Sequence, residues 1–444
     1  MPTSAIPFSN PARSIELLAV SAGLYLAALI AALVASGLGL FSSGLSAIMA
    51  MLTLFVAAIV SGFSTRYLRA DAARGAFAWK LAAMVGATLL FVTANDVVLL
   101  AIGWIGAGAA MAALIGHVGG WEEARIARRR ATLHFLVADL ALLAALSLLV
   151  WDTGTWRIDQ MLTAISAGSM RVQWSAMLLV VAASVRCALP PFSRWLTRSM
   201  AAPTPVSALM HAGFVNAGGF LLIRFGPMLE QVAGAQLLAI GIGAFAAIWG
   251  SAIMLVRPDV KRSLAGSTVA QMGFMVMSCG LGAYAAACWH LIAHGLFKAW
   301  LFLSSGSTIG RPIAAGADRS PAPLALAVAA VTGVCLAAWA IGGEPLAPTT
   351  VPTLLAIATA AAAMPMLGRD PFALLPAAVL ILLYVAGLAA VEAALGRPVG
   401  TAPGGNGLTA LLLALFFACW LGQWVLIRNG RGFPPRLHAR LLNS

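Results

Sequence analysis

Charged side chains are scarce in this chain of 444 residues: Asp, Glu, Lys and Arg make up 9%, against 61% hydrophobic residues. An ordinary soluble domain carries about 25% charged residues, so a soluble globular fold is excluded. Acidic residues are the scarcer kind, and the formal net charge is +13. The basic residues lie in short segments between long apolar runs, which argues against nucleic acid as a partner. The composition predicts a polytopic membrane protein.

The chain also lacks the patterns of metal, redox and hydrolytic sites. Its five cysteines are scattered without a C-x-x-C pair, which is typical of small buried hydrophobes. It has no P-loop, no G-x-S-x-G motif and no His/Cys set at zinc spacing. We therefore predict no enzyme activity, cofactor or metal in this chain. Its first residues do not match a cleaved signal peptide, so the first apolar run is expected to stay as a membrane helix.

Apolar runs long enough to cross a bilayer recur along the whole chain. About 20 apolar residues span the hydrocarbon core, and this criterion predicts about fourteen transmembrane helices. They lie near residues 14–35, 45–64, 77–95, 97–118, 131–150, 174–192, 204–225, 235–256, 263–282, 285–307, 322–342, 351–367, 372–395 and 407–427. The predicted fold class is all-α, with residues 1–444 forming a single integral membrane domain.

The distribution of Lys and Arg predicts how these helices are oriented, because cytoplasmic loops carry an excess of basic residues. Most of the 27 Lys and Arg lie at the termini and after even-numbered spans, whereas the other loops hold only Arg157, Arg171 and Arg397. Both termini are thus predicted cytoplasmic, in the cell inner (plasma) membrane. Residues 121–130, WEEARIARRR, are expected to form a cytoplasmic loop. This loop would mainly determine orientation, and its charges also suit lipid headgroups or a partner.

One apolar segment, residues 288–307, carries three ionisable side chains. His290, His294 and Lys298 recur every four residues, so they share one helix face and extend over roughly 12 Å. An ionisable residue at mid-membrane costs about 2.5–3.5 kcal/mol on insertion scales, and such residues mark ion or proton routes. A lone histidine would more often be a satisfied core residue, and a lone lysine would extend to the interface. Three in register favour a proton relay.

A second polar region surrounds the prolines Pro190 and Pro191. Two successive prolines remove two backbone donors and clash with the preceding turn, so the helix must break or kink there. Membrane proteins tolerate such a break where the freed carbonyls line a cavity or meet protein partners. Arg186 precedes the break and His211 follows it. Asp139, inside an earlier apolar run, must either stay protonated or pair with a cation.

Three segments resemble a known family: residues 186–224, 261–279 (KRSLAGSTVAQMGFMVMSC) and 288–307 (CWHLIAHGLFKAWLFLSSGS). The PTPVSAL-x-H block and the H-x-x-x-H-x-x-x-K helix are similar to those of antiporter-like proton-conducting subunits of respiratory complex I and of Mrp-type antiporters. Within that superfamily, the phrases ALMHAGFVNAGGFLLIRF, STVAQMGFM and FLSSGS resemble the DabB family, the membrane subunits of two-component inorganic carbon transporters.

The resemblance implies two inverted five-helix repeats, each with a discontinuous helix, and a polar axis near the midplane. Residues 96–234 and 235–370 would be the two half-channel repeats, between N-terminal helices (1–95) and C-terminal helices with a basic tail (371–444). The implied relay comprises Asp139, Arg186, His211, Lys261, His290, His294 and Lys298. For Lys261, spacing leaves open an ordinary role as a cytoplasmic anchor.

The function implied is conduction of H⁺ or Na⁺ in an energy-coupled transporter of inorganic carbon (CO2 or bicarbonate). The partner would be a DabA-like cytoplasmic zinc protein resembling a β-type carbonic anhydrase, so zinc and CO2 hydration would belong to that partner. One alternative is an antiporter-like subunit of a complex I-type or Mrp-type cation/proton complex. Another is a scaffold whose relay has been lost.

The chain departs from the complex I pattern in several places. Ile105 stands where that pattern has a glutamate, and Arg186 stands where it has the lysine of the broken helix. The pKa of arginine is too high for it to cycle protons. Arg186 is therefore expected to be a fixed charge, with the first half-channel altered or closed. Near Gly342 no clear counterpart of the second broken-helix lysine is found.

Overall fold

The computed structural model describes residues 11–166, 168–308, 349, 351–354, 374–396, 403, 405–428 and 433–443. Regular structure in these residues is helical, apart from one isolated β-bridge between Asp96 and Arg157. Eight of the described helices are long and apolar enough to cross a membrane. Within the described residues, the predicted all-α, multi-pass membrane architecture is thereby confirmed. About fourteen spans and two inverted repeats stay predictions. The span expected at 322–342, the region near Gly342 and most of the span expected at 351–367 lie outside the described residues.

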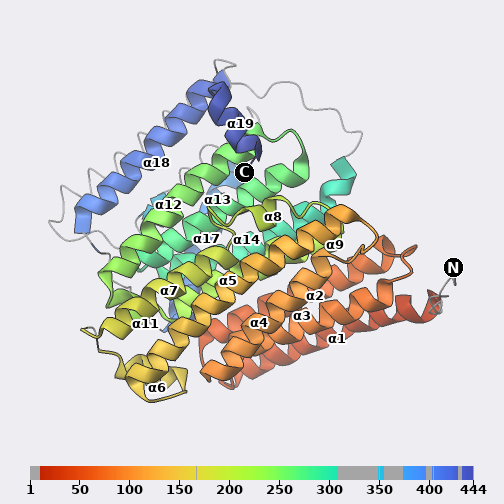
Figure 1. The fold of residues 1–444 in the computed structure, drawn as a ribbon, viewed down its shortest axis with the longest axis horizontal. Helices are drawn as coiled ribbons and strands as arrows, with labels where there is room; N and C mark the ends of the chain where they lie inside the picture. Colours follow the sequence, from red (N-terminus) through yellow and green to blue (C-terminus); the bar gives the residue numbers. More distant parts are fainter. Residues whose placement is uncertain are drawn as a thin grey trace.

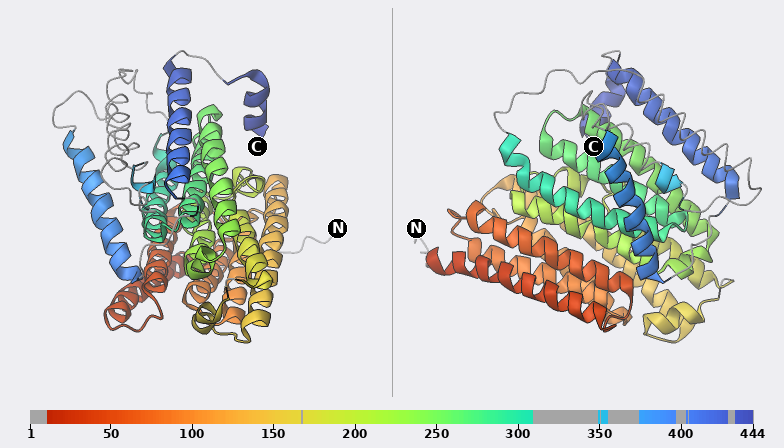
Figure 2. Two further views of the ribbon diagram at one scale, coloured as in Figure 1. Left: turned by 90° about the vertical axis from the view of Figure 1, so that its left-hand side faces the viewer. Right: turned by 180° about the vertical axis from the view of Figure 1, so that it is seen from behind.

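The helices run side by side in one bundle (Figures 1 and 2). The first part of the chain forms α1 (Pro11–Gly37), α2 (Gly44–Tyr67), α3 (Arg74–Thr93), α4 (Val97–Ile115), α5 (Glu122–Thr153), α6 (Ile158–Ala164) and α7 (Met170–Arg186). The middle part forms α8 (Arg194–Thr197), α9 (Thr204–Leu209), the π-helix η1 (Met210–Phe214), α10 (Asn216–Arg224), α11 (Gly226–Glu230), α12 (Ala233–Val256), α13 (Val260–Gly280), α14 (Tyr284–Ser304) and the 3₁₀-helix η2 (Ser305–Thr308). The described C-terminal helices are α17 (Leu374–Leu395), α18 (Gly405–Arg428) and α19 (Pro435–Asn443).

Helix α5 corrects one prediction, because it begins at Glu122, inside the segment expected to be a loop. Glu122 and Glu123 occupy its first turn, where negative charge is favourable at the positive end of the helix dipole. Ala124 and Ala127 are buried on its inner face. Glu, Ala and Arg are strong helix formers, so the helix continues past the end of the apolar run. The prediction was wrong because hydropathy marks where lipid contact ends and not where the helix ends.

The helix break predicted from the proline pair is confirmed. α7 ends at Arg186, α8 begins at Arg194, and the Pro190–Pro191 peptide bond between them is cis. The indole Nε1 of Trp195 donates to the carbonyl of Val185 at 2.9 Å. The last carbonyls of a helix lack partners within the helix. One of the carbonyls freed by the break is thus satisfied from α8.

Helices α12 and α13 form a pair whose backbones meet at glycines. A Cβ atom added to Gly250 would overlap the backbone of Ala270, and one added to Gly273 would lie 2.6 Å from the backbone nitrogen of Ala247. Small residues at such contacts let membrane helices approach closely. This contact places α13 between α12 and the α14 segment that carries the predicted relay (Figure 1).

We expect Gly250→Ala to lower the stability of the protein by about 1–3 kcal/mol, because backbone atoms of α13 cannot move aside for the new methyl group. Gly241→Ala is the matched control, since nothing lies within 4 Å of a Cβ at this position of the same helix. Thermal unfolding of the two detergent-purified variants provides the comparison. Equal melting temperatures would contradict the proposed backbone contact.

Candidate functional site

Helix α14 carries His290, His294 and Lys298, here called the α14 stripe, on the face that lies inside the bundle. His294 and Lys298 are buried, at 5% and 1% exposure, and His290 is half-buried. The rings of His290 and His294 lie 5.9 Å apart and within 20° of parallel. Phe297 and Trp300 on the same helix are 56% and 64% exposed. The ionisable groups thus share the inner face of α14, and aromatic side chains form its outer face.

A chain of hydrogen bonds runs from α14 through α13 to η1. Lys298 Nζ donates to the backbone carbonyl of Leu264 at 3.1 Å, and the Thr268 hydroxyl donates to the same carbonyl at 3.0 Å. Thr268 Oγ1 also lies 2.9 Å from Nδ1 of His211. In this arrangement the single hydroxyl proton points to Leu264, so Nδ1–H of His211 is the donor to Oγ1. Lys298 and His211 are therefore linked through two groups of α13.

His211 lies where the helical segment from Thr204 to Arg224 widens into the π-helix η1. Such π-bulges often occur at functional sites. The ring of His211 is fully buried and stacks on Phe302 with centroids 4.2 Å apart. A Cβ at Gly295 would lie 2.8 Å from the carbonyl oxygen of Ala212. The glycine after His294 thus lets α14 approach the bulge closely.

Several buried polar atoms in this region have no hydrogen-bond partner in the described part of the protein. They are Nε2 of His211, His290 and His294, and Oδ1 of Asn216. The amide of Asn216 donates to Ala212 and Leu291 at 2.9 and 3.4 Å. An unsatisfied buried polar group costs about 1–3 kcal/mol, so such groups are normally paired with protein or ordered water. The interior face of α14 is accordingly a polar environment suited to water.

Arg186 forms a second charged centre at the end of α7. Its side chain is 1% exposed, and Nη2 lies 2.9 Å from Oδ1 of Asp139 and 3.2 Å from the carbonyl of Trp104. The guanidinium carbon lies 4.0, 4.8 and 5.1 Å from the ring centroids of Trp104, Phe214 and Phe135. Aromatic faces attract such a cation. Asp139 is therefore paired with a cation, which is one of the two states expected for it.

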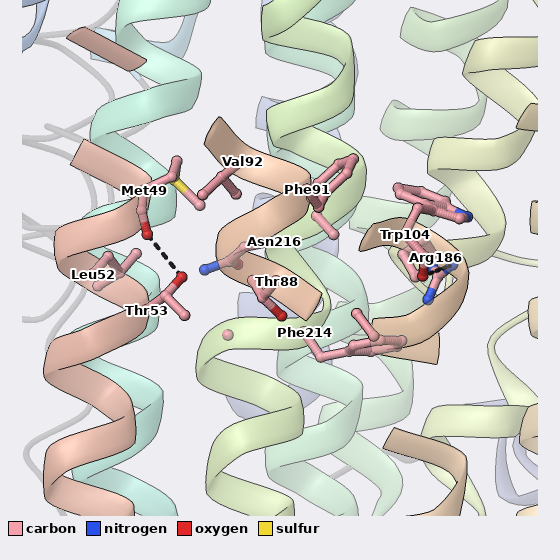
Figure 3. Close-up of a pocket in the computed structure, with 13 residues that line it drawn as sticks. Met49, Leu52, Thr53, Thr88, Phe91, Val92, Trp104, Arg186, Phe214 and Asn216 are labelled. Carbon is pink, nitrogen blue, oxygen red and sulfur yellow. Dashed lines mark hydrogen bonds between the residues drawn. The ribbon is translucent and has the colours of Figure 1, made fainter. Parts of the chain in front are cut away.

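A small cavity lies beside this centre (Figure 3). It has a volume of about 20 Å³, which is room for about one water molecule. Thr53, Thr88, Arg186 and Asn216 provide its polar lining, from α2, α3, α7 and α10. Asn216, which lines this cavity together with Arg186, also donates to the backbone carbonyl of Leu291 on α14.

The structure places Lys261 and Ile105 away from these centres. Lys261 is half-buried in the first turn of α13, and Thr268 lies about 10 Å further along the helix. That position agrees with the alternative of a cytoplasmic anchor. Ile105 is 37% exposed on α4, whereas the adjacent Trp104 is buried against Arg186.

Sequence reasoning did not assign Thr268, the Leu264 carbonyl or Asn216 to the site. A threonine within a Met-rich apolar run was the available signal for Thr268, and an asparagine in the span that follows the break was the signal for Asn216. A backbone carbonyl has no signature in sequence. Contacts through it become visible only when the helices are packed.

A third ionisable cluster lies at the turn after α4. Nε2 of His117 is 3.1 Å from Oδ2 of Asp71, and Nδ1 is 3.5 Å from Nζ of Lys80. The ring meets Phe77 edge-on, with centroids 5.3 Å apart. Burial lowers the pKa of His117 below its ordinary 6.5; the hydrogen bond with Asp71 opposes this shift, and the charge of Lys80 adds to it. A protonated ring would also present a second donor to the Lys80 ammonium.

We expect the melting temperature to fall as the pH drops below about 6.5, because unfolded His117 then binds a proton that the folded state resists. A lowered folded-state pKa means that this contribution is fully present above the ordinary pKa and is lost as the pH falls through the folded value. His117→Gln should flatten this part of the pH dependence. The control is His134→Gln, whose ring contacts the Arg130 carbonyl. An unchanged slope in His117→Gln would disprove the assignment.

Comparison with known proteins defines the class. The family described as NADH:quinone oxidoreductase/Mrp antiporter, TM, matches residues 94–318, which include Asp139, Arg186, His211 and the α14 stripe. The chain belongs to this family. In the solved Mrp complex from Dietzia sp. DQ12-45-1b, one chain is similar with a TM-score of 0.58 and 29% identity, covering 81% of this chain and 40% of that one.

Several curated relatives are also similar to this chain. The probable inorganic carbon transporter subunit DabB of Bacillus anthracis is 36% identical over 300 residues, covering 66% of this chain and 59% of the relative. DabB1 of Halothiobacillus neapolitanus is 38% identical over 278 residues, covering 61% and 50%. NADH-quinone oxidoreductase subunit L of Mycobacterium tuberculosis is 36% identical over 275 residues, covering 61% and 43%. This chain thus spans about half the length of these relatives.

Proposed function

We propose that this chain is the proton- or cation-conducting membrane subunit of an inorganic carbon transporter. The observation that carries the proposal is the group of titratable side chains buried together inside the bundle, Lys298 and His294 on α14 and His211 on η1. The similarity to proteins named as DabB subunits supports inorganic carbon as the coupled substrate.

The residues on the inner face of α14 suit proton transfer for a chemical reason. A neutral imidazole has one donor and one acceptor nitrogen, so it can receive a proton on one side and release another on the opposite side. His211, His290 and His294 each leave Nε2 buried without a partner among the residues that the structure describes, and water is the smallest group that satisfies such atoms. Lys298 supplies the cation from which a proton starts or to which it returns. Arg186, held by Asp139, supplies a fixed field beside this path.

A DabA-like cytoplasmic zinc protein is the proposed partner, with zinc and CO2 hydration in that protein. The membrane subunit would lie in the cell inner membrane with both termini in the cytoplasm. We further propose the arrangement of about fourteen spans in two inverted repeats, which the resemblance to antiporter-like subunits implies.

Purification from native membranes, followed by metal analysis and identification of the bound proteins, tests this function. We expect a zinc protein to co-purify. In cells that contain the system, we expect uptake of labelled bicarbonate that stops when an uncoupler is added. Co-purification with quinone-binding or iron–sulfur subunits would instead establish the alternative, an antiporter-like subunit of a complex I-type or Mrp-type assembly. The observation that supports this alternative is the similarity of the chain to subunit L and to a chain of the Mrp complex.

A further inference from the structure

An open pocket lies where α8, the α12–α13 turn and α19 come together. Its volume is about 590 Å³, and its lining residues include Arg198, Arg257 and Arg262. These arginines come from three separate places in the chain: the end of α8, the end of α12 and the start of α13. The fold therefore brings together cationic groups that repel one another.

Further charges surround this pocket. Burial lowers the pKa of Arg257, and the positive charge of Arg262 lowers it further, whereas Asp259 opposes the shift. Arg198 and Arg194 both lie close enough to Arg130 for their charges to interact with it. The nearby carboxylates are Glu123, which lines the pocket, and Asp259, which lies 3.9 Å from Arg262. Arginine is the cation best suited to bind phosphate oxygens in pairs.

Apolar side chains share the pocket with the arginines. Trp121 is 58% exposed and lines it together with Met200 and Leu442. Tryptophan is enriched at the boundary between membrane and water. Inorganic phosphate has no apolar atoms to pack against these side chains. The glycerol and upper acyl carbons of a phospholipid can pack against them.

The adjacent helix α19 also has the character of an interfacial helix. Its Leu441 is buried, Arg436 and Arg440 are exposed, and the helix packs against α12. Short helices with one apolar and one basic face lie in the plane of the membrane surface. Arg198 donates to the backbone carbonyl of Asn443 at 2.5 Å, which fixes the end of α19 beside the pocket.

We propose that this pocket binds the phosphate headgroup of an anionic phospholipid, with Arg198, Arg257 and Arg262 around the phosphate and Trp121 against the glycerol. Basic pockets between membrane helices on the cytoplasmic side bind anionic headgroups in this way. The pocket would then hold a lipid that joins α8, α13 and α19 at the membrane surface.

The test is a lipid titration of the purified protein in neutral detergent, followed by melting temperature and native mass spectrometry. Phosphatidylglycerol should raise the melting temperature, because a ligand of the folded state stabilises it, and phosphatidylcholine should not. Loss of one charge-assisted contact should weaken binding about tenfold in Arg262→Ala and in Arg198→Ala. Both side chains are exposed, so the variants are expected to fold. Arg157→Ala is the control, an exposed arginine paired with Asp159 outside the pocket.

Three outcomes would overturn the proposal. Full stabilisation by inorganic phosphate alone would identify a soluble anion as the ligand. An unchanged lipid response in both variants would remove the arginines from the binding site. In the third outcome, a partner protein binds the wild type and fails to bind both variants, while the wild type shows no response to lipid. That result would identify this surface as a protein interface. None of these results depends on whether the chain conducts ions, so the test is independent of the proposed function.

Discussion

Lys298→Ala is expected to abolish bicarbonate accumulation while leaving the membrane protein assembled. The substitution removes the buried cation that α14 presents to the Leu264 carbonyl, and with it the amine that can exchange protons with the buried histidines through water. Loss of a positioned proton-transfer group typically costs at least about 100-fold in rate. Uptake of labelled bicarbonate, in a strain that depends on this system for growth in air, is the measurement. His294→Ala should give the same result.

Lys298→Arg separates proton transfer from fixed charge. Arginine keeps the positive charge and the donor to Leu264, but its pKa is too high for it to release a proton. We therefore expect this variant to be inactive as well, with normal amounts of protein and of any bound partner. Wild-type growth of Lys298→Ala in air would remove Lys298 from the relay, and full activity of Lys298→Arg would reduce its role to that of a fixed charge.

Removal of the Asp139 carboxylate is expected to cause the largest loss of stability. Asp139→Ala leaves the Arg186 guanidinium buried without its charged partner, and breaking a buried pair from one side costs about 3–5 kcal/mol. The double variant Asp139→Leu/Arg186→Met removes both charges and should recover most of this loss. Thermal unfolding in detergent gives the comparison.

The matched control for Asp139→Ala is Asp159→Ala. Asp159 pairs with Arg157 at 3.0 Å, but both side chains are more than half exposed. Exposed ion pairs contribute little to stability, so the melting temperature of this variant should stay at the wild-type value. A double variant as unstable as Asp139→Ala would mean that the pair is needed for reasons other than charge compensation.

The features predicted well from sequence are those that depend on local geometry. The spacing of His290, His294 and Lys298 fixes a shared helix face whatever surrounds it, and two prolines break a helix in any context. The start of α5 was misplaced because an amphipathic extension has the composition of a loop. The roles of Leu264 and Thr268 could not be predicted, since they depend on how α13 packs against α14 and η1.

The pairing of Arg186 with Asp139 could be predicted in part from the sequence and in part only from the packed structure. A carboxylate in an apolar run predicts a partner without naming it. The three aromatic rings around the guanidinium come from α4, α5 and η1, so only the packed bundle reveals them. They explain how an arginine remains charged and fixed at this depth.

The Leu264 carbonyl can couple the position of Lys298 to the tautomer of His211. It has two lone pairs but is approached by the Lys298 ammonium, the Thr268 hydroxyl and, as part of α13, the backbone N–H of Thr268. When the ammonium bonds strongly, the hydroxyl is favoured to turn and donate to Nδ1 of His211, which selects the other tautomer of that ring. By thermodynamic linkage, the tautomer of His211 must bias the position of Lys298 by an equal free energy. Besides the direct effect of the Lys298 charge, the two residues would thus be coupled through competition for one oxygen atom.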